Sequence, residues 1–171
     1  MATVFLSAKL LKLIGIDRLN APDSSDNLLQ QWNAHLFPIF GRKCILVTNK
    51  LTLYSFVKLD IFKKDLIDLK AYFLTSLIRQ LIADGFADKE IFYSWRSSFA
   101  DLNIQRTDND KRVIGTMNDS IYQLRIAIEY KVPPLRVLTD LTAGSYLNNN
   151  IYGVLKYKSP IEQIASLENC A

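Results

Sequence analysis

The sequence contains few of the residues that usually mark metal and redox sites: its 171 residues include two cysteines and one histidine. Cys44 and Cys170 lie far apart and form no C-x-x-C motif, which argues against thiol redox chemistry and the common zinc ribbons. The lone histidine, His35, excludes H-E-x-x-H and any two-histidine catalysis within one chain. The six glycines do not form G-x-G-x-x-G or G-x-x-x-x-G-K, and G-x-S-x-G is missing. We therefore expect no metal and no cofactor.

Long apolar runs are missing as well. The longest fall far short of the about 20 residues that span a bilayer. The apolar start, residues 1–16, is interrupted by lysines and no small-residue cleavage site follows it. We therefore expect a cytoplasmic protein without a membrane partner. Hydrophobic residues make up 49% and charged residues 22%, a globular balance that excludes a disordered chain. We expect one domain, residues 1–171.

Hydrophobic periodicity predicts an α+β fold. A short strand over residues 3–7 leads into a helix over 8–14, and three β runs within 31–59 predict an antiparallel meander. A further edge strand is predicted over 102–106. Apolar residues at spacings of three and four predict three main helices at about 65–84, 88–99 and 112–131. We expect a small antiparallel sheet packed against these helices, with a C-terminal extension, residues 133–171, packed on the domain.

Several strings of the sequence, taken in order, resemble a known family. They run from T-V-F-L-S-A-K-L-L through Q-W-N-A-H-L, G-R-K-C-I-L-V-T-N and I-A-D-G to D-K-R-V-I-G-T-M-N-D, over roughly residues 3–130. The chain resembles a bacterial family of uncharacterised proteins, the domain of unknown function 6933. The resemblance implies a small cytoplasmic α+β domain and no assigned activity. One departure is W-N-A-H-L where the family often has W-H-A-N-L, which exchanges the residues at positions 33 and 35.

The first candidate for chemistry is His35 with Asn33 beside it on the same strand face. A histidine titrates near neutral pH and is the natural general base or acid, and Asn33 would orient it or bind a carbonyl. The alternative is that His35 is only a partly exposed strand residue, because no second acid–base partner is visible nearby in the sequence.

A second candidate is a basic hairpin, residues 40–64. It holds six cations against one carboxylate, Asp60, so its local charge of +5 exceeds the +4 of the whole chain. Tyr54 and Phe56 alternate along it and would stack on bases while the cations contact phosphates. The alternative is a solvated sheet edge on which lysines block strand pairing. The six cations are Arg42, Lys43, Lys50, Lys58, Lys63 and Lys64.

A third candidate is the start of the helix at Arg112. Helical spacing places Arg112, Thr116 and Asp119 on one face, opposite the apolar seam, with Gly115 at its edge. Glycine costs a helix about 1 kcal/mol relative to alanine, and such a local conflict sometimes marks a site. The alternative is a solvated face with a helix-packing glycine.

Two functions remain open from the sequence. One is a non-enzymatic interaction or accessory module that binds nucleic acid or another protein through the basic hairpin and the Arg112 face. The other is a small nucleic-acid-acting enzyme, ribonuclease-like or toxin-like, with His35 as base. In that second case Arg42, Arg106 or Arg112 would stabilise the phosphoryl charge and must lie near His35.

Overall fold

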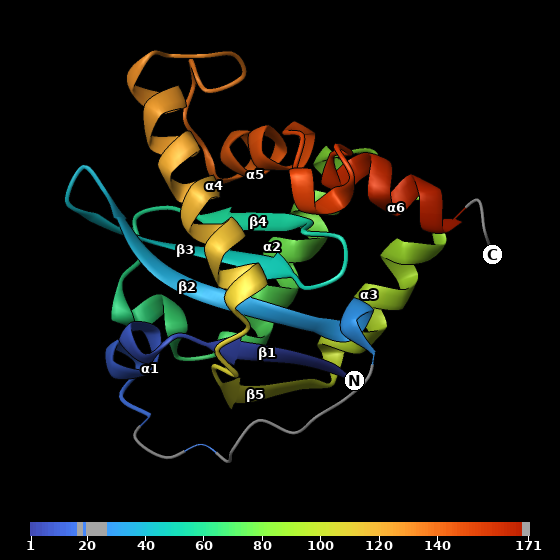
Figure 1. Cartoon of the computed structure of the whole chain (residues 1–171). Helices are drawn as coiled ribbons and strands as arrows, with labels where there is room; N and C mark the ends of the chain where they lie inside the picture. Colours follow the sequence, from blue (N-terminus) through green and yellow to red (C-terminus); the bar gives the residue numbers. More distant parts are fainter. Residues whose placement is uncertain (17–18, 20–26, 169–171) are drawn as a thin grey trace.

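A five-stranded sheet in the order β4-β3-β2-β1-β5 forms the centre of the molecule (Figure 1). The computed structural model describes residues 1–16, 19 and 27–168, so Cys170 lies outside the described residues. Strands β2, β3 and β4 form the predicted antiparallel meander. The strands are β1 (Ala2–Leu6), β2 (Gln31–Ile39), β3 (Arg42–Asn49), β4 (Ser55–Lys58) and β5 (Leu102–Arg106).

The prediction of a purely antiparallel sheet is wrong, because the sheet is mixed. β1 runs parallel to both of its neighbours, β2 and β5. A parallel neighbour needs a crossover connection, usually a helix, and the chain supplies one with α1 (Ala8–Ile14) between β1 and β2. The sequence already predicted a strand, a helix and a strand in this order, which is the pattern of two parallel strands.

Six α-helices are present among the described residues, twice the three main helices that were predicted. The three predicted helices correspond to α2 (Leu69–Ala83), α3 (Glu90–Ala100) and α4 (Lys111–Glu129). The others are α1, α5 (Asp140–Asn149) and α6 (Pro160–Glu168). Of the last two, α5 was missed because its apolar residues follow a weak helical period, and α6 was not counted as a main helix because it is short, with nine residues. Each described helix is too short or too polar to cross a membrane.

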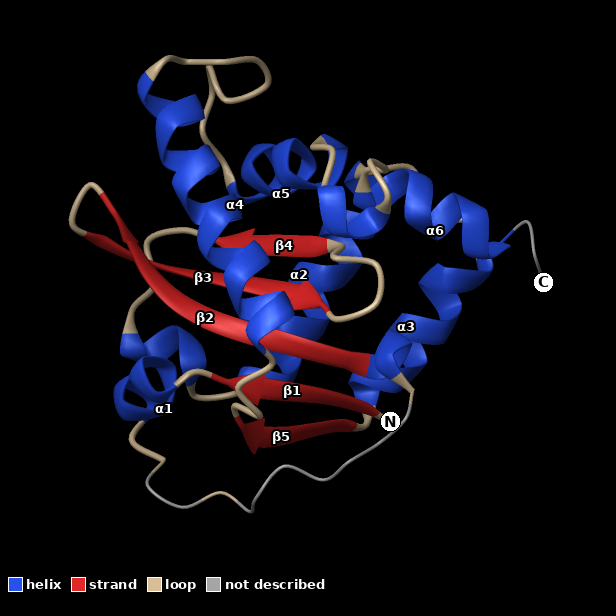
Figure 2. Cartoon of the chain, in the orientation of Figure 1, coloured by secondary structure: helices blue, strands red, loops and turns tan. Residues whose placement is uncertain are grey.

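The helices cover the sheet from both sides, with α4 in front and α2 and α3 behind in the view of Figure 2. Alternate residues of each strand therefore enter different cores. Val4, Trp32 and Phe56 join the core under α2 and α3, whereas Phe37 and Leu46 join the core under α4 and α5. Leu10 of α1 belongs to the α2–α3 side.

The C-terminal part packs on the meander through α5. Ala143 and Leu147 enter the core of the α4 face. Asn148 is buried, and both polar atoms of its side-chain amide bind the β4 backbone. Its Oδ1 accepts from the Ser55 backbone N–H at 2.7 Å, and its Nδ2 donates to the Ser55 carbonyl at 2.8 Å. This helix therefore satisfies backbone groups of β4, an outer strand of the sheet.

Candidate functional site

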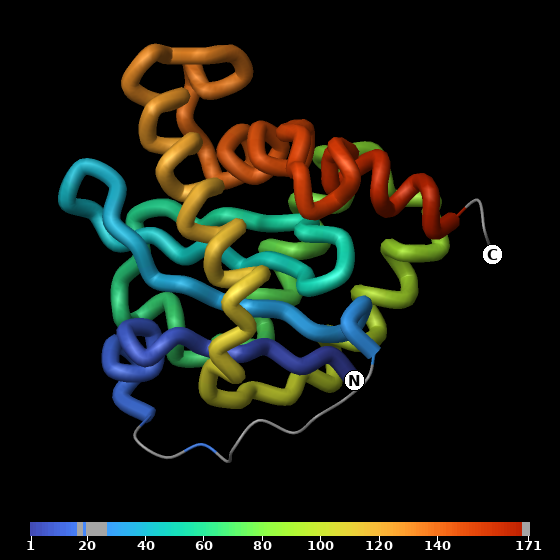
Figure 3. Tube along the Cα trace, in the orientation of Figure 1, coloured from blue at the N-terminus to red at the C-terminus, as the bar shows by residue number. Residues whose placement is uncertain are grey.

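The chain leaves two neighbouring parallel strands, β1 and β5, in opposite directions (Figure 3). A pocket lies at this place. After β1 the chain enters α1, on the α2–α3 side of the sheet, whereas after β5 it enters α4 on the other side. Such a switch leaves a crevice beyond the carboxyl ends of the strands, which is where open α/β sheets bind ligands. Ser7 and Thr107 continue the two strands, donating their backbone N–H groups to Ala34 and Leu6 carbonyls, each at 3.0 Å.

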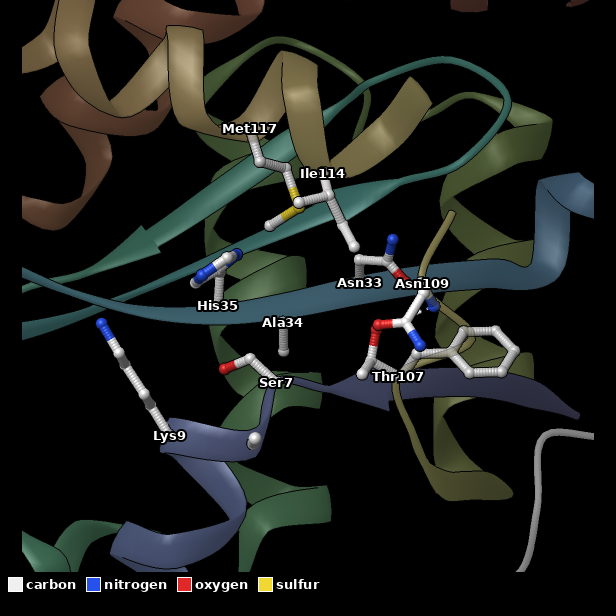
Figure 4. Close-up of a pocket in the computed structure, with 11 residues that line it drawn as sticks. Ser7, Lys9, Asn33, Ala34, His35, Thr107, Asn109, Ile114 and Met117 are labelled. Carbon is white, nitrogen blue, oxygen red and sulfur yellow. Dashed lines mark hydrogen bonds between the residues drawn. The ribbon is translucent and has the colours of Figure 1, made fainter. Parts of the chain in front are cut away.

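The pocket encloses about 260 Å³ and has one apolar and one polar side (Figure 4). Ile114 and Met117 of α4 cover it, while Ser7 and Ala34 lie on the opposite side. Asn33 and His35 project from β2 between these walls, and Lys9 extends from α1 on the His35 side. The remaining lining residues are Phe5, Ala8, Thr107 and Asn109.

Asn33 is the unusual residue of the pocket. Its side chain is only 4% exposed, yet neither its Nδ2 nor its Oδ1 has a hydrogen-bond partner among the described residues. An unsatisfied buried polar group costs about 1–3 kcal/mol, so native structures rarely keep one without a reason. Trp32 and Gln30 also leave one buried polar atom each unpaired, but neither lines the pocket.

The neighbours of Asn33 in the sheet make its isolation clearer. Strand register places Asn33 beside Thr48, and Thr48 beside Ser55, on the α4 face. All three are buried, but Thr48 and Ser55 share a hydrogen bond of 2.8 Å between their hydroxyls. Asn33 points instead toward the pocket, between Ile114 and Asn109. In this row of buried polar side chains, Thr48 and Ser55 have hydrogen-bond partners, whereas Asn33, which lies at the pocket, has none among the described residues.

His35 is half-buried on the same face, two residues along β2. Burial lowers the pKa of its imidazole below the usual 6.5, and the nearby charge of Lys9 lowers it further. The imidazole is therefore neutral at physiological pH and is able to accept a proton or a hydrogen bond. The sequence prediction that Asn33 and His35 share one face is confirmed by their common place in the pocket.

A buried lysine fixes the wall formed by the β5–α4 connection. The Lys50 side chain is 1% exposed, donates to the Asp108 carboxylate and lies over the Phe5 ring at 3.9 Å from its centroid. Asp108 in turn accepts from the Asp110 backbone N–H at 3.2 Å. Arg112 donates to the Lys50 carbonyl oxygen. The loop that carries Thr107 and Asn109 is thereby tied to the turn after β3.

The three arginines proposed for an enzyme do not line the pocket. Arg106 lies opposite Leu6 in the strand register, so it belongs to the face of Leu6 and not to that of His35. Arg112 is engaged by the Lys50 carbonyl oxygen, and Arg42 pairs with Asp60 at 2.8 Å near the hairpin tip. None of the three arginines therefore lines the pocket beside His35.

The Arg112 face is likewise different from its prediction. Asp119 is exposed, but Thr116 is buried and its hydroxyl donates to the Arg112 carbonyl at 2.9 Å. Gly115 is not a packing glycine, since a Cβ there would meet no atom within 4 Å. The prediction that Thr116 lies on an exposed face was wrong, because the buried face of α4 includes polar residues as well as apolar ones.

The basic hairpin also loses much of its predicted character. The prediction that Tyr54 and Phe56 stack on bases is wrong, because both rings are buried in the core. The Tyr54 hydroxyl donates to Asp84 at 2.7 Å, and burial, reinforced by that carboxylate, raises its pKa. Lys50 and Lys58 pair with Asp108 and Asp140. Exposed cations remain near the hairpin tip, at Arg42 and Lys43, and in the segment that starts at Lys63.

Sequence reasoning missed the pocket residues that come from the strand ends: Ser7, Lys9, Thr107 and Asn109. The sequence did contain a signal for these residues, because they lie at the end of a predicted strand or directly after it, at 7–9 and 107–109. The described residues hold no group of three or more His, Cys, Asp or Glu side chains that could bind a metal.

Comparison with known proteins gives one family. A family model described as Domain of unknown function (DUF6933) matches residues 3–163. The match extends beyond the 3–130 range of the resembling strings and takes in α5 and the start of α6. A search of curated proteins finds no match.

Proposed function

The chain belongs to the DUF6933 family, a domain of unknown function, and we propose that it is a non-enzymatic binding module that holds a small ligand in the pocket of Asn33 and His35. The observation that supports this most is the Asn33 side chain, 96% removed from solvent and without a partner at either polar atom. A ligand that pairs with this amide would remove its desolvation cost and convert it into binding free energy.

The pocket suits a particular ligand chemistry. A primary amide offers an acceptor oxygen and a donor nitrogen side by side, so its complement is a planar group with an adjacent donor and acceptor. Carboxamides, lactams and nucleobase edges share this pattern. Phe5, Ile114 and Met117 add apolar walls around it. The cavity of about 260 Å³ lies just below the usual range for ligand sites, which favours a ligand of one ring and disfavours a dinucleotide.

One observation favours the enzymatic alternative. Burial and Lys9 keep His35 unprotonated, as a general base must be. No carboxylate or arginine lines the pocket beside it, so the arginines that the enzyme hypothesis assigns to the developing phosphoryl charge are absent from the lining. Binding without turnover is therefore the function that the geometry supports better.

The test is a binding titration with simple probes: benzamide, nicotinamide and uracil, which carry the amide edge, and toluene, which does not. Binding is followed by ¹H–¹⁵N NMR, which reports the Asn side-chain amide directly. We expect the amide-bearing probes to shift the Asn33 side-chain resonances and toluene to leave them unchanged. Failure of all three amide probes to shift any pocket resonance would overturn the proposal.

Two variants locate the effect. Asn33→Leu removes the donor and acceptor at similar size and should abolish probe binding. Thr48→Val is the matched control, since Thr48 is the neighbour of Asn33 in the buried polar row but does not line the pocket. Probe binding that persists in Asn33→Leu, or that disappears equally in Thr48→Val, would contradict the assignment to Asn33.

A further inference from the structure

Two adjacent hollows flank the Arg42–Asp60 ion pair at the tip of the β2–β3 hairpin. They enclose about 680 Å³ and 370 Å³, and both are lined by Arg42 and Asp60. Phe62 lines the larger hollow and Phe40 the smaller. The hairpin extends beyond the rest of the sheet (Figure 1), so these hollows lie at one end of the molecule, on a different surface from the Asn33 pocket.

Phe40 occupies a backbone position that does not suit it. Its φ is +46° and that of the following Gly41 is +78°, values typical of the two central residues of a type I′ turn. Asn and Gly favour such positions, whereas a bulky aromatic residue there is strained. The Phe40 side chain is also 76% exposed, so packing does not offset the strain. Strained residues of this kind cluster at binding and functional sites.

The larger hollow is basic and includes a second exposed ring. Arg42, Lys43 and Lys63 line it against the single carboxylate of Asp60, whereas the smaller hollow beside Phe40 has the Arg42–Asp60 pair as its charged residues. Phe62 is 63% exposed and carries the Lys64 ammonium over its ring, 5.6 Å from the centroid. Exposed aromatic rings set among cations in a groove are the arrangement by which proteins hold single-stranded nucleic acids without reading their sequence.

We infer that the two hollows at the hairpin tip are a docking groove for single-stranded nucleic acid. Bases stack on Phe40 and Phe62, and the phosphates between them contact Lys43 and Lys63, while Arg42 stays paired with Asp60. A duplex keeps its base faces covered and would leave both rings unused. Only a few of the cations of the 40–64 segment take part, because Lys50 and Lys58 are paired elsewhere.

The test is fluorescence anisotropy of the full chain with labelled single-stranded RNA, single-stranded DNA and duplex DNA of about 12 nucleotides. The two single strands distinguish RNA from DNA as the natural source of the same chemistry. We expect both to bind, with affinity that falls steeply with salt, and the duplex to bind more weakly. Phe40→Asn should weaken binding about tenfold and at the same time raise the melting temperature, because Asn relieves the turn. Lys43→Glu should weaken binding and flatten its salt dependence.

Tyr157→Asn is the matched control. Tyr157 is also an exposed aromatic residue, 81% exposed with a φ of +61°, and it lies between two lysines, but it lines neither hollow. Its replacement should leave binding unchanged. Unchanged binding by Phe40→Asn, loss of binding in Tyr157→Asn, or binding to phosphatidylserine vesicles but not to single strands would each overturn the inference. Cleaved strands on a gel would instead overturn the non-enzymatic function proposed above.

Discussion

The two faces of the sheet differ in the polar groups that they leave unpaired among the described residues: one indole N–H, at Trp32, on the α2–α3 face, and both atoms of a side-chain amide, at Asn33, on the α4 face. On the α2–α3 face, Trp32, Trp95, Phe56 and Phe99 are buried to 0 or 1% exposure and form a continuous set of ring contacts, mostly edge-to-face. On the α4 face, the corresponding row of the sheet contains Asn33 with both polar atoms unpaired. One face therefore stabilises the fold, and the other gives up stability at one position beside a pocket.

This difference teaches where to look for function in a protein without catalytic signatures. Both faces are close-packed over most of their area, and the hydrophobic content of the strands does not distinguish them. The distinguishing feature is a local conflict: a buried amide that the fold does not satisfy. Such conflicts tend to be retained where a ligand resolves them.

The largest expected effect is on the aromatic face. Trp95→Ala removes contacts with Trp32 and Tyr54, at centroid distances of 4.8 and 5.5 Å, and the hydrogen bond from its indole to the Leu29 carbonyl. We expect it to lower the free energy of unfolding by about 3–5 kcal/mol, measured by urea denaturation. Met117→Ala, on the pocket side of α4, should cost about 2 kcal/mol. If Met117→Ala lowered the free energy of unfolding more than Trp95→Ala does, the aromatic face would not be the one that stabilises the fold more.

The same substitution at two buried asparagines sharpens the comparison. Asn148→Leu leaves the Ser55 backbone N–H and carbonyl without their partners, and we expect a loss of about 2–4 kcal/mol. Asn33→Leu removes two unpaired atoms and should leave the free energy of unfolding within about 1 kcal/mol of the wild type, or raise it. Equal losses in urea denaturation would show that Asn33 is satisfied in the folded protein.

The smallest expected effect is a pH dependence from His35. Its pKa in the folded protein lies below 6.5, so the unfolded chain takes up a proton first as the pH falls. The unfolded state is then favoured, and stability is lost from about pH 6.5 down to the folded pKa. His35→Gln should lessen this loss in denaturation curves measured across that range. Superimposable pH profiles for the two proteins would contradict the burial of the imidazole.

Local patterns in the sequence were enough to predict the meander, the three longer helices and the shared face of Asn33 and His35, because each depends on a period of 2 or about 3.6 residues. The parallel pairing of β1 with β2 was within reach of the sequence, because a helix connects the two strands. The pairing of β1 with β5, about 100 residues away, was not. Lys50 was counted among the free cations of the basic hairpin, but it pairs with Asp108, which lies in a loop far along the chain. The prediction that Tyr54 stacks on bases was wrong for the same reason, because residues of α2 and α3, which follow it in the chain, bury its ring.

The pairing of β1 with β5 has a consequence for how the protein is made. During synthesis, β1 leaves the ribosome long before the strand that completes its hydrogen bonding, residues 102–106, is translated. Pairings of such high sequence separation form slowly and after local contacts. The pocket, with walls at 7–9, 33–35 and 107–117, is therefore among the last parts to be assembled. The proposed ligand pocket is thus complete only in chains that have been translated at least through the first turns of α4.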